Sequence, residues 1–287
     1  MRRVTAFALA WLLSGSVMAS ESEPAPYELK GEWRQGSLLL GKTEPGAQVW
    51  FNDRKLNLTA RGEFVFGLDR DEKNRVEIKF QASAKAKPQV FRYAVATRKY
   101  DIQNITGLPQ GMVTPTPEDE ERIAQDQHRI TAARNRETAQ EGFIQPFVWP
   151  CEGRISGIFG SQRILNGVPK QPHYAVDVAV PVGTPVKAPA DGIVSLAESD
   201  FYLTGGTLMI DHGHGLVSTM IHLSKLLVKA GDHVKQGQIV AESGMTGRAT
   251  GPHLHWGVSW FNARVDAQLL VSPMPLTPTP LPEGEGK

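Results

Sequence analysis

Hydrophobic and polar residues alternate along two long stretches of the chain, which a polar segment separates. The first stretch, residues 27–100, contains short alternating runs such as "GAQVWFNDRKL" and "NRVEIKFQA", bounded by turn residues. The second stretch, residues 147–271, shows the same alternation with many glycines, as in "GTLMIDHGHGL". Alternation with a period of two predicts strands, and several short strands joined by tight turns are typical of all-β domains. The pattern therefore predicts two all-β domains, the first of them a small β-sandwich.

The segment between them, residues 101–146, changes from a linker rich in Pro and Gly to a helical pattern. Thr116 is a suitable N-cap, Pro117 suits the first helical position, and the acidic residues that follow complement the positive end of the helix dipole. The apolar stripe is thin, with Ile123 and Ile130 seven residues apart. We expect a linking α-helix that lies across a surface between the domains rather than in a core.

Both ends of the chain differ from the globular stretches. Residues 1–19 combine a basic pair, an apolar run and small residues, which is typical of a secretory signal peptide. The apolar run is shorter than the roughly 20 residues of a spanning helix, so no stable membrane span is expected after cleavage. The last segment, residues 272–287, is a Pro-rich tail.

Composition excludes two classes of protein. The chain has 287 residues and a formal net charge of +1, which does not suit a nucleic-acid polycation, so no nucleic-acid partner is expected. Cys151 is the single cysteine, which excludes an internal disulfide and a thiolate-rich metal cluster. A small buried thiol is the expected role of Cys151.

Candidate chemistry concentrates in the second stretch, which holds seven of the eight histidines. His173 and Asp177 lie four residues apart in "HYAVD", and His222 lies in "MIHLS". His253 and His255 lie two residues apart in "GPHLHWGV", so on a strand they share one face. Imidazole and carboxylate groups are zinc ligands, and a catalytic zinc site has three protein ligands and one open position. Spacing alone leaves open which imidazole of the His-x-His pair would bind the metal. The remaining histidines of this stretch are interpreted as turn residues: His212, His214 and His233.

The second stretch resembles a known family. The segments "PHYAVDVAVPVG", "GTLMIDHGHGLVSTMIHLS" and "GRATGPHLHW" look like the catalytic domain of the lysostaphin-like zinc metallopeptidases, also called LytM-type peptidoglycan endopeptidases. The linker segment "YDIQNITGLPQGMVTPTPED" is similar to the interdomain region of Gram-negative members. The resemblance implies an antiparallel β-sheet catalytic fold, one zinc ion per chain and hydrolysis of peptide cross-links in peptidoglycan. The bond expected from it is D-alanyl to meso-diaminopimelate in the peptide stems. The signal-peptide pattern and the absence of disulfides fit a periplasmic location for such an enzyme.

The same resemblance implies a role for each candidate side chain. The matching zinc ligands are His173, Asp177 and His255. The catalytic residues beside the metal are His222 and His253, which would orient the attacking water, stabilise the oxyanion or carry a proton to the leaving amine. Which of these two histidines is the acid and which is the base stays open.

The remaining positions of the resemblance concern substrate contacts. Arg163 in "FGSQR" matches a basic position at the rim of the family's groove, where it would meet a substrate carboxylate; a surface salt bridge is the alternative. Three residues depart from the common pattern: Ala175 replaces a glycine, Met220 a frequent tyrosine and Gly257 a frequent glutamate. None of them removes a ligand, so we expect them to affect substrate contacts and rate rather than the metal site.

The first stretch resembles bacterial immunoglobulin-like modules in "PGAQVWFNDRKLNLTARGEFVF". It contains no cluster of titratable groups, which favours a spacer or a module that docks an envelope partner, dispensable for chemistry. The rival to an enzyme is a non-catalytic LytM-type module that binds the wall and regulates amidases. Such a regulator would show substitutions in the metal or catalytic set, whereas all five positions are filled here.

Overall fold

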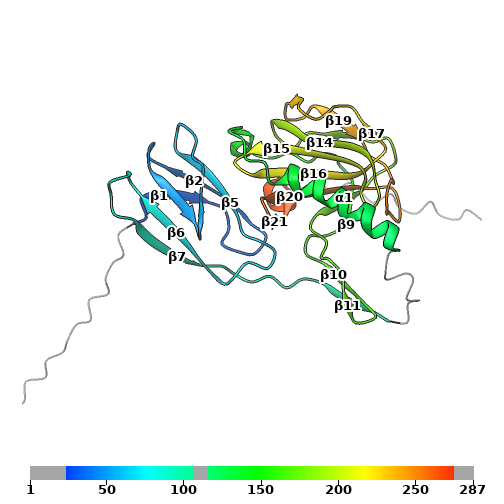
Figure 1. The fold of residues 1–287 in the computed structure, drawn as a ribbon, viewed down its shortest axis with the longest axis horizontal. Coiled ribbons are helices and arrows are strands. Elements are labelled where there is room, and N and C mark those ends of the chain that lie inside the picture. The colour runs from blue at the N-terminus through cyan, green and yellow to red at the C-terminus, as the bar shows by residue number, and fades with distance from the viewer. Residues whose placement is uncertain (1–23, 107–115, 275–287) are drawn as a thin grey trace, which may run out of the picture.

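The computed structural model describes residues 24–106 and 116–274, which form two groups of β-sheets side by side (Figure 1). We call the sheets of β1 to β7 the first domain and those of β9 to β21 the second domain. The predicted signal peptide, residues 1–19, and most of the Pro-rich tail lie outside the described residues. Within the described ranges, no helix has the length and apolar character needed to cross a membrane.

The first domain consists of two antiparallel sheets that share an aromatic core. One sheet joins β1 (Tyr27–Lys30), β2 (Leu38–Thr43) and β5 (Glu63–Gly67); the other joins β4 (Arg54–Lys55), β3 (Gln48–Phe51), β6 (Arg75–Gln81) and β7 (Gln89–Ala94). Phe51 of one sheet stacks on Phe66 of the other, with ring centroids 4.5 Å apart. The alternation of "RVEIKF" places Val76, Ile78 and Phe80 inside. Two sheets over one core agree with the predicted sandwich, and the immunoglobulin-like character stays a prediction.

The second domain is built on an eight-stranded antiparallel sheet, which confirms the β-rich fold expected from the sequence. Its main path is β18 (His233–Val234), β14 (Gly192–Phe201), β15 (Gly205–Gly213), β16 (Leu216–Leu223), β20 (Leu254–Trp260), β12 (Val176–Ala179) and β9 (Arg154–Gly157), and β21 (Ala263–Val265) pairs with β20. A small sheet joins β13 (Pro185–Lys187), β19 (Ile239–Glu242) and β17 (Lys225–Leu226). Val176, Val178, Leu254 and Trp256 are fully buried between these layers.

The linker after the first domain adds a strand to the second. β8 (Ile102–Ile105) pairs in parallel with β10 (Gln162–Leu165), which pairs with β11 (Val168–Pro169). The β10 segment continues to His173, whose amide donates to the Ser161 carbonyl at 2.8 Å. The linker therefore borders the chain segment that carries a predicted metal ligand.

Helix α1 (Pro117–Arg134) begins where the sequence predicts. The Thr116 hydroxyl accepts a hydrogen bond from the Asp119 amide, as expected of an N-cap. The helix lies against β14 and β15 of the second domain rather than between the domains (Figure 1). Its buried residues Ile130 and Ala133 meet an apolar cluster of that sheet, formed by Leu196, Phe201, Met209 and Val217. The position differs from the expected one because the apolar side chains of α1 are buried against this cluster on the sheet.

The two domains pack through a common hydrophobic core. Phe51 contacts Trp260 edge to face, with ring centroids 5.8 Å apart, and a Cβ added at Gly67 would lie 2.9 Å from the Trp260 Cβ. His214, which has a φ of +50° in the β15–β16 turn, donates from Nδ1 to the Asn57 carbonyl of the first domain at 2.9 Å. The two domains are therefore in direct contact and are not joined by the linker alone.

A buried polar network joins side chains of β15, β16 and β20. His212 lies in β15, not in a turn as predicted, and is fully buried. Its Nδ1 donates to the Asp191 carbonyl at 2.8 Å, and its Nε2 accepts from the Ser218 hydroxyl at 2.9 Å. The Trp256 indole donates to the same hydroxyl at 3.3 Å. Burial lowers the pKa of His212 to about 4, so this imidazole is neutral in the folded protein.

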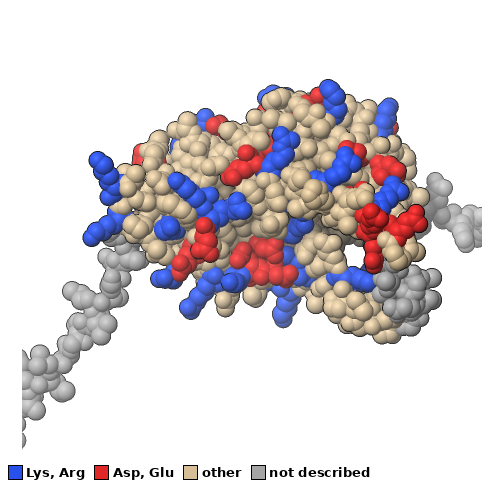
Figure 2. Space-filling model, in the orientation of Figure 1, with Lys and Arg blue, Asp and Glu red and all other residues tan. Residues whose placement is uncertain are grey.

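Charged side chains are mixed over the face shown in Figure 2, where basic and acidic groups alternate. This agrees with the formal net charge of +1. No broad surface of one sign covers this face.

Replacing Ile130 by Ala should weaken the contact between α1 and the sheet. Loss of a buried branched side chain costs about 2 kcal/mol or more of unfolding free energy, because the cavity is only partly refilled. Urea denaturation of the full chain measures this change. The matched control is Gln127→Ala, an exposed position of the same helix that should change stability by less than about 0.5 kcal/mol. Equal effects of the two substitutions would contradict the packing of α1.

The buried His212 should make stability depend on pH. The unfolded chain takes up a proton at this histidine near pH 6.5, whereas the folded chain does so only at about pH 4. The unfolding free energy should therefore fall as pH is lowered from about 6.5 to 4, with His212 contributing up to about 3 kcal/mol. Denaturation curves of the wild type and His212→Asn across this window test it. A variant with the same pH slope as the wild type would show that His212 does not contribute.

Candidate metal centre

Two neighbouring strands and the loop before one of them bring three polar atoms together. Asp177 on β12 and His255 on β20 are direct partners in the antiparallel register. The Asp177 Oδ1 lies 2.8 Å from His255 Nδ1 and 3.0 Å from His173 Nε2. The two imidazole nitrogens are 3.1 Å apart. The atoms thus form a nearly equilateral triangle.

This triangle fits a single metal ion. A tetrahedral zinc ion with bonds of about 2.0 to 2.1 Å spaces its ligand atoms about 3.3 Å apart, so a small opening of the triangle would suffice. The His173 Nδ1 donates to the Ile158 carbonyl at 3.0 Å, which leaves its Nε2 directed at the centre. The three side chains are 21% to 23% exposed, so one side of the centre remains accessible. Among the described residues, these three are the group of His, Cys, Asp and Glu that could hold a metal.

Electrostatics favour an ionised carboxylate and a neutral His255 at the centre, whereas they favour the protonated form of His173. Burial disfavours the charged form of Asp177, but hydrogen bonds with His173 and His255 outweigh it and hold the pKa of this carboxyl well below its usual range. Burial also lowers the pKa of His255, although the carboxylate opposes this shift. For His173, burial is outweighed by the bond to Asp177, so its pKa is raised. The carboxylate is already ionised, while the proton that His255 Nδ1 shares with Asp177, like the one on Nε2 of His173, must leave that atom when a metal binds.

His222 and His253 lie beside the triangle. Their ring centroids are 4.9 Å apart, and the His253 Nε2 lies 3.8 Å from the Asp177 Oδ1. Each ring donates from Nδ1 to a backbone carbonyl at 2.8 Å, His222 to Thr246 and His253 to Gly251. Since a carbonyl only accepts, Nδ1 carries a proton in both rings, so Nε2 is the ring nitrogen that could exchange a proton at the centre. Burial lowers the pKa of His222 to about 4, so this histidine is neutral at pH 7.

Backbone contacts hold His222 in an uncommon conformation. Its φ of +63° lies in the left-handed region, which side chains with a Cβ rarely adopt. The His222 amide donates to the Thr204 carbonyl at 2.9 Å. The Thr246 hydroxyl accepts from the Gly206 amide at 2.9 Å and donates to the Leu223 carbonyl at 2.8 Å, which fixes the loop whose carbonyl holds the His222 ring. Sequence analysis missed Thr246, because a threonine in a glycine-rich turn carries no sign of such contacts.

Other predicted residues occupy positions around the centre. Arg163 is exposed on β10, and its positive charge opposes protonation of His173, which places the two side chains in electrostatic reach. Ala175 and Met220 are fully buried. A Cβ added at Gly257 would lie 2.9 Å from the Tyr174 carbonyl, so a larger residue there requires the backbone to move. These departures from the family pattern therefore sit in the packing and leave the three converging atoms untouched.

Cys151 is a buried free thiol, as predicted. Burial raises the pKa of this thiol to about 12. Because the thiolate is the reactive form, Cys151 is a poor nucleophile at neutral pH.

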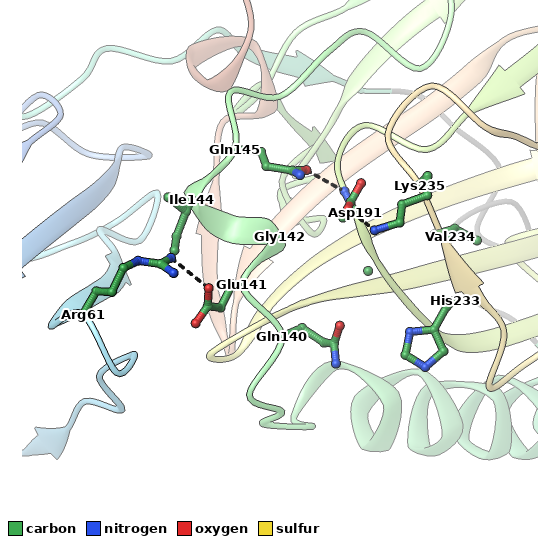
Figure 3. Close-up of a pocket in the computed structure, with 11 residues that line it drawn as sticks. Arg61, Gln140, Glu141, Gly142, Ile144, Gln145, Asp191, His233, Val234 and Lys235 are labelled. Carbon is green, nitrogen blue, oxygen red and sulfur yellow. Dashed lines mark hydrogen bonds and ion pairs between the residues drawn. The ribbon is translucent and has the colours of Figure 1, made fainter.

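A separate pocket of about 360 Å³ lies where the first domain, the segment 140–145 and β18 meet (Figure 3). His233, which lies on β18 and not in a turn as predicted, lines this pocket. Its charged groups are already paired, with Arg61 2.9 Å from Glu141 and Lys235 2.7 Å from Asp191. The pocket shares no residue with the candidate metal centre.

Comparisons with known proteins agree with this geometry. The peptidoglycan DD-endopeptidase ShyA of Vibrio cholerae is 41% identical over 125 residues, which cover 43% of this chain and 28% of the relative. An uncharacterized metalloprotease of Haemophilus influenzae is 33% identical over 247 residues, which cover 80% of this chain and 46% of the relative. The chain thus spans less than half the length of these curated relatives.

A solved structure and a family model extend the comparison. A crystal structure from Pseudomonas aeruginosa that is assigned to peptidase M23 superposes with a TM-score of 0.66 at 29% identity, covering 84% of this chain and 95% of the other. The model of peptidase family M23 matches residues 171–267, the range that contains His173, Asp177, His222, His253 and His255. The second domain of this chain is therefore a peptidase domain of family M23.

Proposed function

We propose that this chain is an exported zinc metalloendopeptidase that hydrolyses peptide cross-links of peptidoglycan in the periplasm. The observation that carries the proposal is the convergence of His173 Nε2, Asp177 Oδ1 and His255 Nδ1 within 3.1 Å of one another, with His222 and His253 beside them. Relatives named as peptidoglycan DD-endopeptidases match part of the chain. Export rests on the signal-peptide pattern of residues 1–19.

Two imidazoles and one carboxylate suit zinc, which accepts these ligands in a tetrahedral arrangement and leaves a fourth position open in catalytic sites. His173, Asp177 and His255 would hold one ion per chain. When bound, zinc supplies a Lewis acid that polarises a carbonyl and lowers the pKa of water to about 7.

The chain's own residues handle the protons. The Nε2 atoms of His222 and His253 accept, because backbone carbonyls occupy both Nδ1 protons. One of them takes a proton from the attacking water and returns it to the leaving amine, while the other orients the water. Proton transfer of this kind contributes on the order of a hundred- to ten-thousandfold to the rate. The Asp177 carboxylate, 3.8 Å from the His253 Nε2, stabilises the imidazolium that forms there.

The substrate is proposed to be the peptide stems of peptidoglycan, cut at the D-alanyl to meso-diaminopimelate bond. Stems carry free carboxylates, and the exposed guanidinium of Arg163 on β10 would meet one of them; its electrostatic effect on His173 supports this role. The first domain offers a surface for an envelope partner.

Digestion of purified muropeptides with a mass readout tests the function. Cross-linked dimers should be converted to monomers, and the masses of the two monomers should add up to the mass of the dimer plus one water. A zinc chelator should stop the conversion. If the zinc-loaded protein left dimers intact and instead stimulated an amidase, the protein would be a non-catalytic regulator of amidases and not an endopeptidase.

Removing a ligand should remove the metal. His173→Ala and Asp177→Ala each leave two ligands, so zinc affinity should fall by about a hundredfold or more. Metal analysis of the purified full chain measures this. His233→Ala, an exposed histidine outside the centre, is the control and should retain one zinc. Full zinc content in both ligand variants would show that the assignment is wrong.

Removing a proton-handling histidine should separate metal binding from turnover. His222→Ala and His253→Ala should keep zinc and lose about a hundred- to ten-thousandfold of the cleavage rate. Zinc content and muropeptide cleavage are measured on the same preparations, with His128→Ala on α1 as the matched control. Loss of zinc in His253→Ala with retention in His255→Ala would reverse the roles within the His-x-His strand.

A further inference from the structure

A buried arginine of the first domain reaches the loop that holds a predicted metal ligand. Arg70 lies between β5 and β6 and is 5% exposed. Its Nε and Nη2 both donate to the carbonyl of Gly160, at 3.0 and 2.7 Å. The two residues are 90 positions apart in the chain and belong to different domains.

The loop that contains Gly160 in turn holds His173 at three points. The Gly160 amide donates to the His173 carbonyl at 2.7 Å, and the His173 amide donates to the Ser161 carbonyl at 2.8 Å. The His173 ring donates from Nδ1 to the Ile158 carbonyl at 3.0 Å. The position of this loop therefore sets both the backbone and the ring orientation of His173.

Tyr100 completes the attachment. Gly160 has a φ of +86°, and a Cβ there would lie 2.0 Å from the Tyr100 ring, so the ring packs directly on the glycine backbone. The Tyr100 hydroxyl donates to the Arg70 carbonyl at 3.1 Å, and the Arg70 guanidinium lies 4.3 Å from the centroid of the same ring. Each of the three residues Tyr100, Gly160 and Arg70 thus contacts the other two.

The buried charge of Arg70 is compensated. Its Nη1 lies 2.6 and 2.9 Å from the two oxygens of Asp71, whose side chain is exposed. A buried cation is tolerated only when it is paired and its donors are satisfied, and both conditions are met here.

A second contact from the same loop leads through Arg264 to the residue after His173. The Asp69 Oδ2 accepts from the Arg264 amide of β21 at 2.8 Å. The Arg264 guanidinium lies 5.1 Å from the ring centroid of Tyr174, the residue after His173. The segment 69–71 is therefore connected to the Gly160 loop and, through Arg264, to Tyr174.

We propose that Arg70 is a positioning residue for the metal centre: by holding the Gly160 carbonyl, it fixes the loop that orients His173. The proposal rests on the proposed function only in taking His173 as a zinc ligand. It gives the first domain a part in building the centre, in contrast to the dispensable module expected from sequence.

Zinc affinity of the full chain tests the proposal directly. Loss of outer partners that orient a ligand commonly weakens metal binding 10- to 100-fold, so Arg70→Ala should raise the zinc dissociation constant about tenfold in competition with a chelator. Arg70→Lys keeps the charge but not the two-pronged contact, so it should fall between the wild type and Arg70→Ala. The control is Arg92→Ala, which removes an exposed arginine paired with Glu77 in the same domain and should change the constant less than about twofold.

A folded Arg70→Ala protein that binds zinc as tightly as the wild type would overturn the proposal. Thermal denaturation establishes whether the variant is folded. The outcome is independent of the proposed function. A protein that binds zinc but leaves muropeptides uncut would contradict the proposed function and would leave the role of Arg70 unaffected.

A measurement on the unaltered protein covers the case in which Arg70→Ala does not fold. Coupling between two sites is reciprocal, so zinc should stabilise the segment that stabilises the zinc site. Hydrogen exchange of residues 69–72 in the wild type should slow when zinc is added, while β6 and β7 should not change. Equal exchange of residues 69–72 with and without zinc would overturn the proposal.

Discussion

The antiparallel pairing of β12 with β20 sets the distance between two of the three groups at the candidate metal centre. Asp177 faces His255 directly across the two strands, and the neighbouring pairs, Val176 with Trp256 and Val178 with Leu254, are buried on the opposite face. A slip of one residue would exchange the faces and bury the carboxylate and imidazole in the core. The cost of burying those polar groups therefore holds the register, and with it the centre.

Desolvation and backbone carbonyls then determine what each imidazole at the centre can do. Partial burial keeps His222 and His255 neutral, while the hydrogen bonds around Asp177 keep that carboxyl ionised. Carbonyls of Ile158, Thr246 and Gly251 each hold the Nδ1 of one histidine. The same kind of hydrogen bond thus directs Nε2 of His173 at the metal position and keeps Nδ1 of His222 and His253 engaged with the backbone. Only His255 presents Nδ1 to the centre.

The two domains act as one packed body in this structure. Besides the Arg70 contact, the Arg98 guanidinium after the first domain lies 2.9 Å from the buried carboxylate of Asp266. A common core that includes Phe51 and Trp260 excludes water from the interface. A domain without catalytic groups can therefore still influence chemistry, because main-chain contacts at its surface orient groups that belong to the other domain.

Local chemistry, readable in the sequence, determined the strands, the start of α1 and the shared face of His253 and His255. The Thr116 cap and the period of two act over a few neighbouring residues, so no distant contact is needed to predict them. The family resemblance added the candidate roles of the histidines. Tertiary structure alone decided which nitrogen of each ring faces the centre, that His212 lies within a strand, that α1 covers the sheet and that Arg70 holds Gly160. Each of these depends on groups many residues apart, and their hydrogen bonds and buried contacts exist only once the sheets have packed.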